Sequence, residues 1–241
     1  MRPTNLPTNL VVALALSMML PGAGCTDADQ PVIILQNQVP DDGCIVPVGA
    51  GSDFRPRGII DTQSGAGYLF TPLAQNNAAA LDGNPTARLA IIEGAEVALT
   101  LQDSAVSVAE GDTNFTKRFS GSIQPNGGLT SFAFTIIDKR VLDAIAGVIE
   151  TPDQRFEVLA EVRLFGTMGG GDLESIPFTY AVDVCTGCMR VNVGPCADLA
   201  DDFVPLTGGK CNPLQDVFTQ CCTELDESLT CPAAKPSPEG V

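Results

Sequence analysis

The sequence predicts a mainly β protein, in which an antiparallel β-sandwich is followed by a small disulfide-rich module. Three observations support this fold class. Apolar and polar residues alternate along many short stretches, Gly (24) and Pro (18) are plentiful enough to turn the chain often, and seven of the nine Cys fall within residues 185–231. A chain of 241 residues is long enough for one sizeable domain with a smaller module beside it.

The alternation is clearest in the second half of the chain. Residues 156–164 (FEVLAEVRL) and 178–184 (FTYAVDV) read as half-buried strands, because every second side chain in them is apolar. The segment between them, 166–175 (GTMGGGDLES), contains three consecutive glycines, which favours a hairpin loop.

Further strands are expected earlier in the chain, and a short helix is expected after Asp138, with Gly147 at its end. Seven or more short strands separated by turn residues are typical of a sandwich with Greek-key connections, as in immunoglobulin and fibronectin domains. We therefore expect residues 32–184 to form a β-sandwich domain. The earlier strands are expected at residues 57–62, 67–73, 97–101, 115–124 and 131–136, with a turn at 125–128 (PNGG) between the last two.

The composition changes at Cys185, and residues 185–232 are expected to form a cysteine-rich module. Within it, Asn212 fits a helix N-cap, Pro213 the first helical position, and Gln215 the third, as in a capping box. Leu214, Val217, Phe218 and Cys221 would then share one face, so the sequence predicts a short helix here. Residues 233–241 read as a Pro-rich tail.

Eight of the cysteines are candidates for disulfide bonds, although the sequence leaves their pairing open among 105 arrangements. Cys221 and Cys222 should bond to different partners, because a bridge between adjacent residues is strained. Cys44 stands alone at the front and must reach the C-terminal module. The candidates are Cys44, Cys185, Cys188, Cys196, Cys211, Cys221, Cys222 and Cys231.

The pair Cys185 and Cys188 forms a C-x-x-C motif, which also occurs in redox proteins and zinc sites. No βαβ pattern surrounds it, and an exported protein meets an oxidising compartment in which paired thiols become disulfides. Structural disulfides are therefore the main expectation, with a cysteine-only zinc site and a redox pair as alternatives.

The amino terminus indicates export. Arg2 is followed by the apolar run 10–20 (LVVALALSMML), which is too short to span a bilayer but has the length of a signal-peptide core. Gly22, Ala23, Gly24 and Cys25 follow, and this segment resembles the lipobox of bacterial lipoproteins, although Gly22 stands where that family usually has Leu. The resemblance implies a signal peptide at residues 1–24, a lipidated Cys25, and a polar spacer within residues 25–31.

Two further features bear on the anchor. Nine is an odd number of cysteines for an exported protein, and acylation of Cys25 leaves eight that can pair completely. Among enterobacterial lipoproteins an Asp after the Cys causes retention in the inner membrane, so Thr26 implies transfer to the outer membrane. The alternative is ordinary cleavage near Ala23, which leaves Cys25 as a free or bridged thiol.

The composition excludes several classes of function. The chain has no His, which removes Ser-His-Asp and Cys-His catalysis and His-ligated metal sites. A net charge of −16 repels nucleic acid and anionic lipid headgroups. The acidic clusters match neither a calcium loop nor a glycosidase pair, and read as solvated turns. We therefore predict no catalytic residue, no metal ligand, no cofactor and no nucleic-acid partner.

Three segments resemble uncharacterised predicted lipoproteins of myxobacterial type. They are residues 67–77 (GYLFTPLAQNN), 184–188 (VCTGC) and 211–222 (CNPLQDVFTQCC). That group has no assigned activity, so the resemblance implies an exported, disulfide-bonded lipoprotein and adds no mechanism.

The expected function is that of a lipid-anchored cell-envelope protein, which binds a protein or glycan partner or has a structural role, and is not an enzyme. One alternative is an envelope hydrolase that acts on polysaccharide with two facing carboxylates, one of them with a raised pKa. A second alternative is a thiol or metal protein of the envelope.

Overall fold

The computed structural model describes residues 30–84, 86–102, 106–151 and 154–234, and within them the prediction of a mainly β protein is confirmed. The helical segments are α1 (Glu110–Thr113), α2 (Lys139–Ala146) and the 3-10 turn η1 (Cys196–Asp198). The strands are β1 (Val32–Gln38), β2 (Phe54–Arg55), β3 (Gly58–Asp61), β4 (Tyr68–Phe70), β5 (Pro72–Asn76), β6 (Ala90–Leu101), β7 (Asn114–Ile123), β8 (Gly128–Ser131), β9 (Phe134–Ile137), β10 (Phe156–Met168), β11 (Gly171–Glu174), β12 (Phe178–Cys185), β13 (Arg190–Pro195), β14 (Thr219–Thr223) and β15 (Leu229–Thr230).

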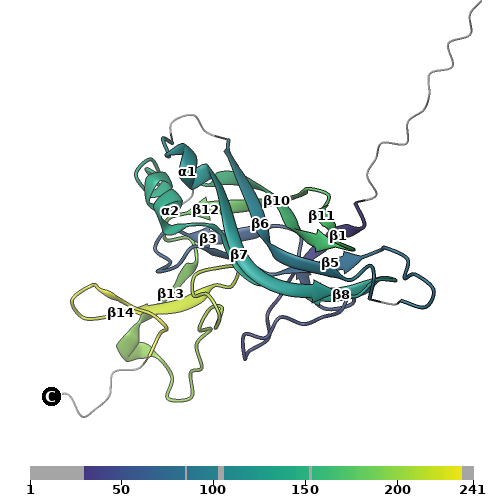
Figure 1. The fold of residues 1–241 in the computed structure, drawn as a ribbon. Helices are drawn as coiled ribbons and strands as arrows, with labels where there is room; N and C mark the ends of the chain where they lie inside the picture. The colour runs from purple at the N-terminus through teal and green to yellow at the C-terminus, as the bar shows by residue number, and fades with distance from the viewer. Residues whose placement is uncertain (1–29, 85, 103–105, 152–153, 235–241) are drawn as a thin grey trace, which may run out of the picture.

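Two large sheets form the body. The first has the order β3-β12-β10-β6-β7, with β11 paired to β10 beyond β12, and the second has the order β2-β1-β5-β8. A β4–β9 pair completes the body, and a small sheet β13-β14-β15 belongs to the C-terminal module. Figure 1 shows β6, β7 and β10 running the length of the body and curling as they do so, with β13 and β14 at one end.

The two strongest strand predictions are confirmed. Residues 156–164 lie in β10 and residues 178–184 lie in β12, and the two strands pair antiparallel. The glycine-rich connection turns at Gly169 and Gly170, which have φ of 61° and 84°, a region that glycine adopts without steric cost. Part of the expected loop is itself a strand, because β11 pairs with the end of β10.

One hydrophobic core lies between the sheets. It takes Val32 and Ile34 from β1, and fully buried side chains such as Ile92 of β6 and Val158 of β10. Helix α2 confirms the short helix expected between Asp138 and Gly147, and it packs on the same core through Val141, Leu142 and Ile145. Each Å² of apolar surface that is removed from water stabilises the packed layers by about 25 cal/mol.

The structure differs from a purely antiparallel arrangement in two places. Strand β12 pairs with β3 in parallel, and β13 pairs with β14 in parallel. Both pairs join segments distant in sequence, for which no hairpin dictates the direction. The main sheets are curled rather than flat layers (Figure 1).

The predicted helix after Asn212 is wrong. Leu214 and Asp216 have φ of 64° and 59°, which a right-handed helix does not allow, and the chain enters strand β14 at Thr219. The side chain of Asn212 donates to the carbonyl of Gly67 at 2.7 Å instead of capping a helix. Contacts with the body have therefore overridden the local capping pattern.

The eight candidate cysteines form four disulfides: Cys44–Cys211, Cys185–Cys188, Cys196–Cys222 and Cys221–Cys231. The adjacent Cys221 and Cys222 bond to different partners, and Cys44 reaches the module, both as expected. No helix within the described ranges is long and apolar enough to cross a membrane. The predicted signal peptide (1–24), Cys25 and residues 235–241 of the tail lie outside the described residues.

Candidate binding pocket

The C-terminal chain docks against the edge of the first large sheet. The amide of Asp216 donates to the carbonyl of Ile59 at 2.9 Å, and the amide of Asp61 donates to the carbonyl of Leu214 at 3.0 Å. Ile60 and Gln215 form an antiparallel bridge between these two bonds. Residues 214–216 thus cover the outer edge of β3, which would otherwise expose unpaired backbone groups.

A side-chain amide extends this contact to β4. The Gln215 amide nitrogen donates to the carbonyl of Leu69 at 2.8 Å, and its oxygen accepts from the amide of Leu69 at 2.8 Å. The side chain therefore satisfies one strand residue as a neighbouring strand would. Asn212 donates to the Gln215 oxygen at 2.6 Å and orients it.

Asp216 is the charged centre of the docking contact, and its side chain is 7% exposed. One carboxylate oxygen accepts from the amide of Ile59 at 2.8 Å, and the other accepts from the Tyr68 hydroxyl at 2.9 Å and the Gln215 amide at 3.1 Å. The Nε of Arg55 lies 3.4 Å from the second oxygen. Burial raises the pKa of Asp216, and these donors and the positive charge oppose that rise.

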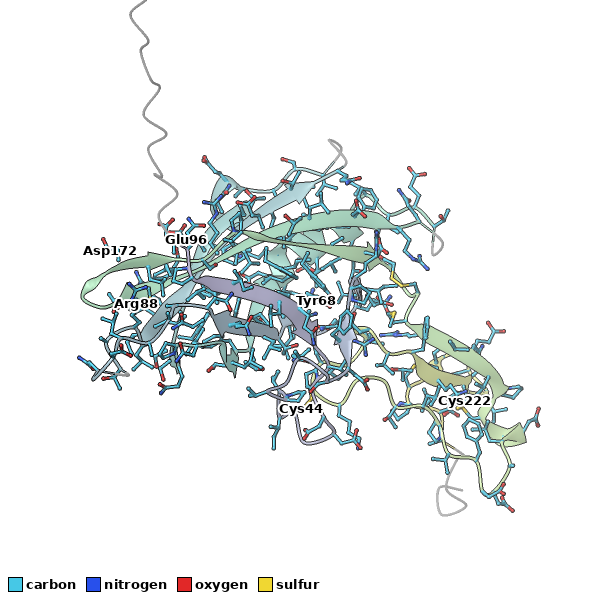
Figure 2. All side chains as sticks on the ribbon, turned by 90° about the vertical axis from the view of Figure 1, so that its right-hand side faces the viewer. Cys44, Tyr68, Arg88, Glu96, Asp172 and Cys222 are labelled. Atoms are coloured by element: carbon cyan, nitrogen blue, oxygen red, sulfur yellow. A yellow bond between two sulfur atoms is a disulfide. The ribbon has the colours of Figure 1, made fainter. Side chains whose placement is uncertain are left out.

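Behind Asp216 lies a pair of buried tyrosines. The Tyr68 and Tyr180 hydroxyl oxygens are 3.0 Å apart, and the Asn37 amide donates to Tyr180 at 2.9 Å. Burial raises the pKa of Tyr180 and raises that of Tyr68 well above its ordinary value. Because both hydroxyls keep their protons, Asn37 donates to Tyr180, Tyr180 to Tyr68, and Tyr68 to Asp216. Figure 2 shows Tyr68 and Cys44 on the part of the body next to the C-terminal module.

A cavity of about 380 Å³ opens over Asp216, between the body and the module. Residues 39–42 with Arg55 and Leu69 form one side, and residues 205–212 and 215–217 form the other. The Cys44–Cys211 disulfide and an ion pair of 2.9 Å between Lys210 and Asp42 join the sides in addition to the contacts of Gln215 and Asp216. Much of the wall is apolar, namely Val39, Pro40, Leu69, Pro205, Leu206 and Val217.

Other hollows are less suited to specific binding. One of about 640 Å³ lies on the module beside Pro195 and Leu225, and all of its lining residues are at least partly exposed. Another of about 390 Å³ lies on β6, β7 and β10, beside Glu96 and Glu161. We consider the pocket over Asp216 the candidate site, because there a buried polar network meets an apolar wall.

The structure also places the C-x-x-C motif. Cys185 and Cys188 are disulfide-bonded to each other, and a carboxylate oxygen of the buried Asp61 lies within 4.8 Å of both sulfurs. That carboxylate accepts from the amides of Gln63 and Met189 at 3.0 and 3.2 Å. Asp61 thus connects the turn after β3, which contains Gln63, to the turn that contains the Cys185–Cys188 disulfide.

The sequence analysis missed Arg55, Tyr68 and Asp216 as site residues. Of the other lining residues, the sequence predicted Asn212 and Gln215 as a helix cap, Val217 as part of the apolar face of that helix, and Cys211 as a disulfide candidate. The available signal was the run Cys211–Asp216 (CNPLQD), in which polar side chains follow one of the module cysteines to which the distant Cys44 could bond. Distant pairing implies that neighbouring polar groups enter a contact with the body.

Comparison with known proteins adds little. No family model matches this chain, and no curated protein matches it. A solved structure described as "Crystal structure of protein from Archaeoglobus fulgidus" aligns with 54% of this chain and 94% of its own, with a TM-score of 0.36 and 10% sequence identity. A similarity of this extent carries no argument about fold or function.

Proposed function

We propose that this protein is exported, is tethered by lipid on Cys25 to the outer membrane, and binds a partner protein through the pocket over Asp216 without catalysing a reaction. The single observation that carries the proposal is the pocket itself, a partly apolar cavity of about 380 Å³ over a fully hydrogen-bonded buried carboxylate. A rigid polar floor under apolar walls is the usual composition of a binding site.

The state of Asp216 favours binding over hydrolysis. A general acid or base needs an oxygen that is free to exchange a proton with the substrate. Both oxygens of Asp216 already accept hydrogen bonds from residues of the protein. A polysaccharide hydrolase would also need a second carboxylate facing the first across the bound sugar. Asp41 also lines the pocket and could be that second carboxylate, but one of its oxygens already accepts hydrogen bonds from the amides of Gly43 and Ile45.

A protein partner fits the pocket better than a glycan. None of the lining residues is aromatic, and sugar rings bind best against aromatic faces. Proline, leucine and valine walls instead suit an aliphatic side chain, because the driving force is removal of apolar surface from water. Leu206 stands on the rim with 57% of its surface exposed, as expected of a residue that a partner covers.

The proposed address rests on the amino terminus and on the cysteines. Four disulfides are formed and maintained in oxidising compartments outside the cytoplasm. Together with the apolar run and the lipobox-like segment before Cys25, they support export and lipid attachment. We also propose that the protein is an envelope lipoprotein of the myxobacterial type, because its segments 67–77, 184–188 and 211–222 resemble that group.

We also propose that the two curled sheets are a variant of the immunoglobulin-like Greek-key sandwich. The common core between them supports this description, and the parallel pairing of β12 with β3 counts against it. Experimental determination of the strand order would test it: a barrel in which the two sheets are continuous would contradict it.

The binding proposal is tested by photo-crosslinking in the native envelope. A benzoylphenylalanine at Leu206 is expected to capture one protein partner, and Val217→Trp, which fills the cavity, should abolish that capture. The matched control places the crosslinker at Ile176, which is 48% exposed on the body and does not line the pocket. Capture at Leu206 that survives Val217→Trp, or that equals capture at Ile176, would contradict the proposal.

A further inference from the structure

We propose that the pocket over Asp216 receives an aliphatic group bearing a carboxylate, and that this carboxylate pairs with the guanidinium of Arg55. The inference rests on the binding role proposed above and names the chemistry of the bound group.

Arg55 is held in the pocket wall with most of its hydrogen-bonding capacity unused. Its side chain is 28% exposed, and its Nε lies 3.4 Å from Asp216. Within the described part of the chain neither terminal nitrogen of Arg55 makes a hydrogen bond or a second ion pair. A guanidinium presents five donors in a planar fork, and the two terminal nitrogens match the two oxygens of a carboxylate. A partly buried fork of this kind binds an anionic group most strongly when it pairs bidentately.

Asp216 does not use up this capacity. Its carboxylate accepts from three groups other than Arg55, namely the Ile59 amide, the Tyr68 hydroxyl and the Gln215 amide. The Asp216 carboxylate therefore keeps these three hydrogen bonds when the terminal nitrogens of Arg55 bind a ligand. The ion pair with Asp216 is made through Nε, so the two terminal nitrogens can face a ligand.

The other charged groups of the pocket have partners of their own. Asp42 pairs with Lys210 at 2.9 Å, so these two charges offset each other at the rim. One oxygen of Asp41 accepts the amides of Gly43 and Ile45 at 2.8 and 2.9 Å. Among the described residues the other lining cation is Lys210, whose side chain is 55% exposed at the rim, whereas that of Arg55 is 28% exposed in the wall.

The apolar part of the wall favours an aliphatic group beside the anion. Leu69, Pro205, Leu206 and Val217 line the cavity, and its volume of about 380 Å³ accommodates a branched aliphatic side chain with its backbone atoms. A carboxylate directly attached to such a group occurs in two sources: the C-terminal residue of a polypeptide, and a free short-chain aliphatic acid. Both offer the same chemistry to Arg55, and they differ in whether a peptide precedes the carboxylate.

The test is calorimetric titration of the full-length chain in detergent with four probes. They are acetyl-Gly-Gly-Leu with a free carboxylate, its C-terminal amide, acetyl-Gly-Gly-Ser with a free carboxylate, and hexanoate. We expect the amide and the serine peptide to bind on the order of tenfold more weakly than the leucine acid, because each lacks one of the two recognised features. Hexanoate binding as tightly as the peptide would identify the free acid as the source, and weaker binding would identify the polypeptide C-terminus.

Three variants at two nearby positions locate the effect. Arg55→Gln should reduce affinity for the leucine acid by about tenfold, and Arg55→Lys should reduce it measurably because the fork is lost. The matched control is Arg57→Gln, which removes the same charge from an arginine that pairs with Glu157 and Asp183 outside the pocket. That control should stay within about twofold of the parent chain.

Equal binding of the acid and the amide by the unaltered chain would overturn the inference, whether or not the variants fold. Equal losses in Arg55→Gln and Arg57→Gln would also overturn it, since the effect would then follow net charge. In either case the binding function would still be supported if the crosslinker at Leu206 captures a partner and Val217→Trp abolishes that capture. If the crosslinker at Leu206 captures no partner in the parent chain, the proposed binding function is itself contradicted.

Discussion

The disulfide Cys44–Cys211 should contribute more to stability than any other bridge of the molecule. It joins residues 167 positions apart, and in the chain-entropy model such a loop restricts the unfolded chain by about 5 kcal/mol at 25 °C. The same relation gives about 1.6 kcal/mol for Cys185–Cys188, which lie 3 positions apart. Since domains are typically stable by about 5–15 kcal/mol, removing the first bridge should bring the protein close to unfolding.

Urea denaturation of two double variants measures this difference. Cys44→Ala with Cys211→Ala should shift the midpoint strongly downward and raise the m-value, because the unfolded chain expands when the long loop is opened. Cys185→Ala with Cys188→Ala is the matched control, with the same chemistry and a loop too short to restrict the chain much. The reasoning is refuted if the control variant loses as much free energy of unfolding as the first, or if the first loses less than about 2 kcal/mol.

Three further predictions concern the buried polar network. Tyr68→Phe should lower the free energy of unfolding by about 1–3 kcal/mol, because Asp216 and Tyr180 lose a buried partner; urea unfolding checks this, and a change below about 0.5 kcal/mol would contradict it. The raised pKa of Asp216 means that the folded state binds its proton more tightly than the unfolded state, so stability from this group is present below its ordinary pKa and is lost as pH rises through the raised value. The free energy of unfolding of the parent chain minus that of Asp216→Asn should therefore fall as pH rises from about 4, and a rise would contradict the assignment. The chain has two Tyr, and burial raises the pKa of both, so absorbance at 295 nm should show less tyrosinate near pH 10 than free tyrosine does, as long as the protein stays folded. The contribution of these hydroxyls is present below their ordinary pKa and is lost above the raised values; titration near pH 10 with unchanged circular dichroism would show that they are not buried.

Strands with a clear period were predictable from sequence, and the reason is local. In β10 and β12 every second residue enters the core, so the pattern itself records which face is buried. Helix α2 was predictable for the same reason, since Val141, Leu142 and Ile145 fall on one helical face. The curling of the sheets and the parallel pairing of β12 with β3 depend on contacts between distant segments, and no local pattern records them.

The pocket was not predictable, because it is formed by residues that are distant in sequence and come together only in the folded chain. Arg55 and Asp216 are far apart in the chain, and each alone reads as an ordinary surface charge. Asn212 and Gln215 carry the spacing of a helix cap, yet their side chains bond to Gly67 and Leu69 of the body. The side chains of Asn212 and Gln215 could form the hydrogen bonds of a helix cap or those with the body. Burial against the body favours the second arrangement.

The most direct measurement of the central claim, that an exported and lipidated chain closes four disulfides, is the intact mass of the protein isolated from the envelope, before and after reduction. The account predicts a chain that begins at Cys25, carries the mass of acyl groups, and gains two hydrogens for each of its four disulfides on reduction. A chain that retains residues 1–24, carries no acyl mass and is unchanged by reduction would contradict it.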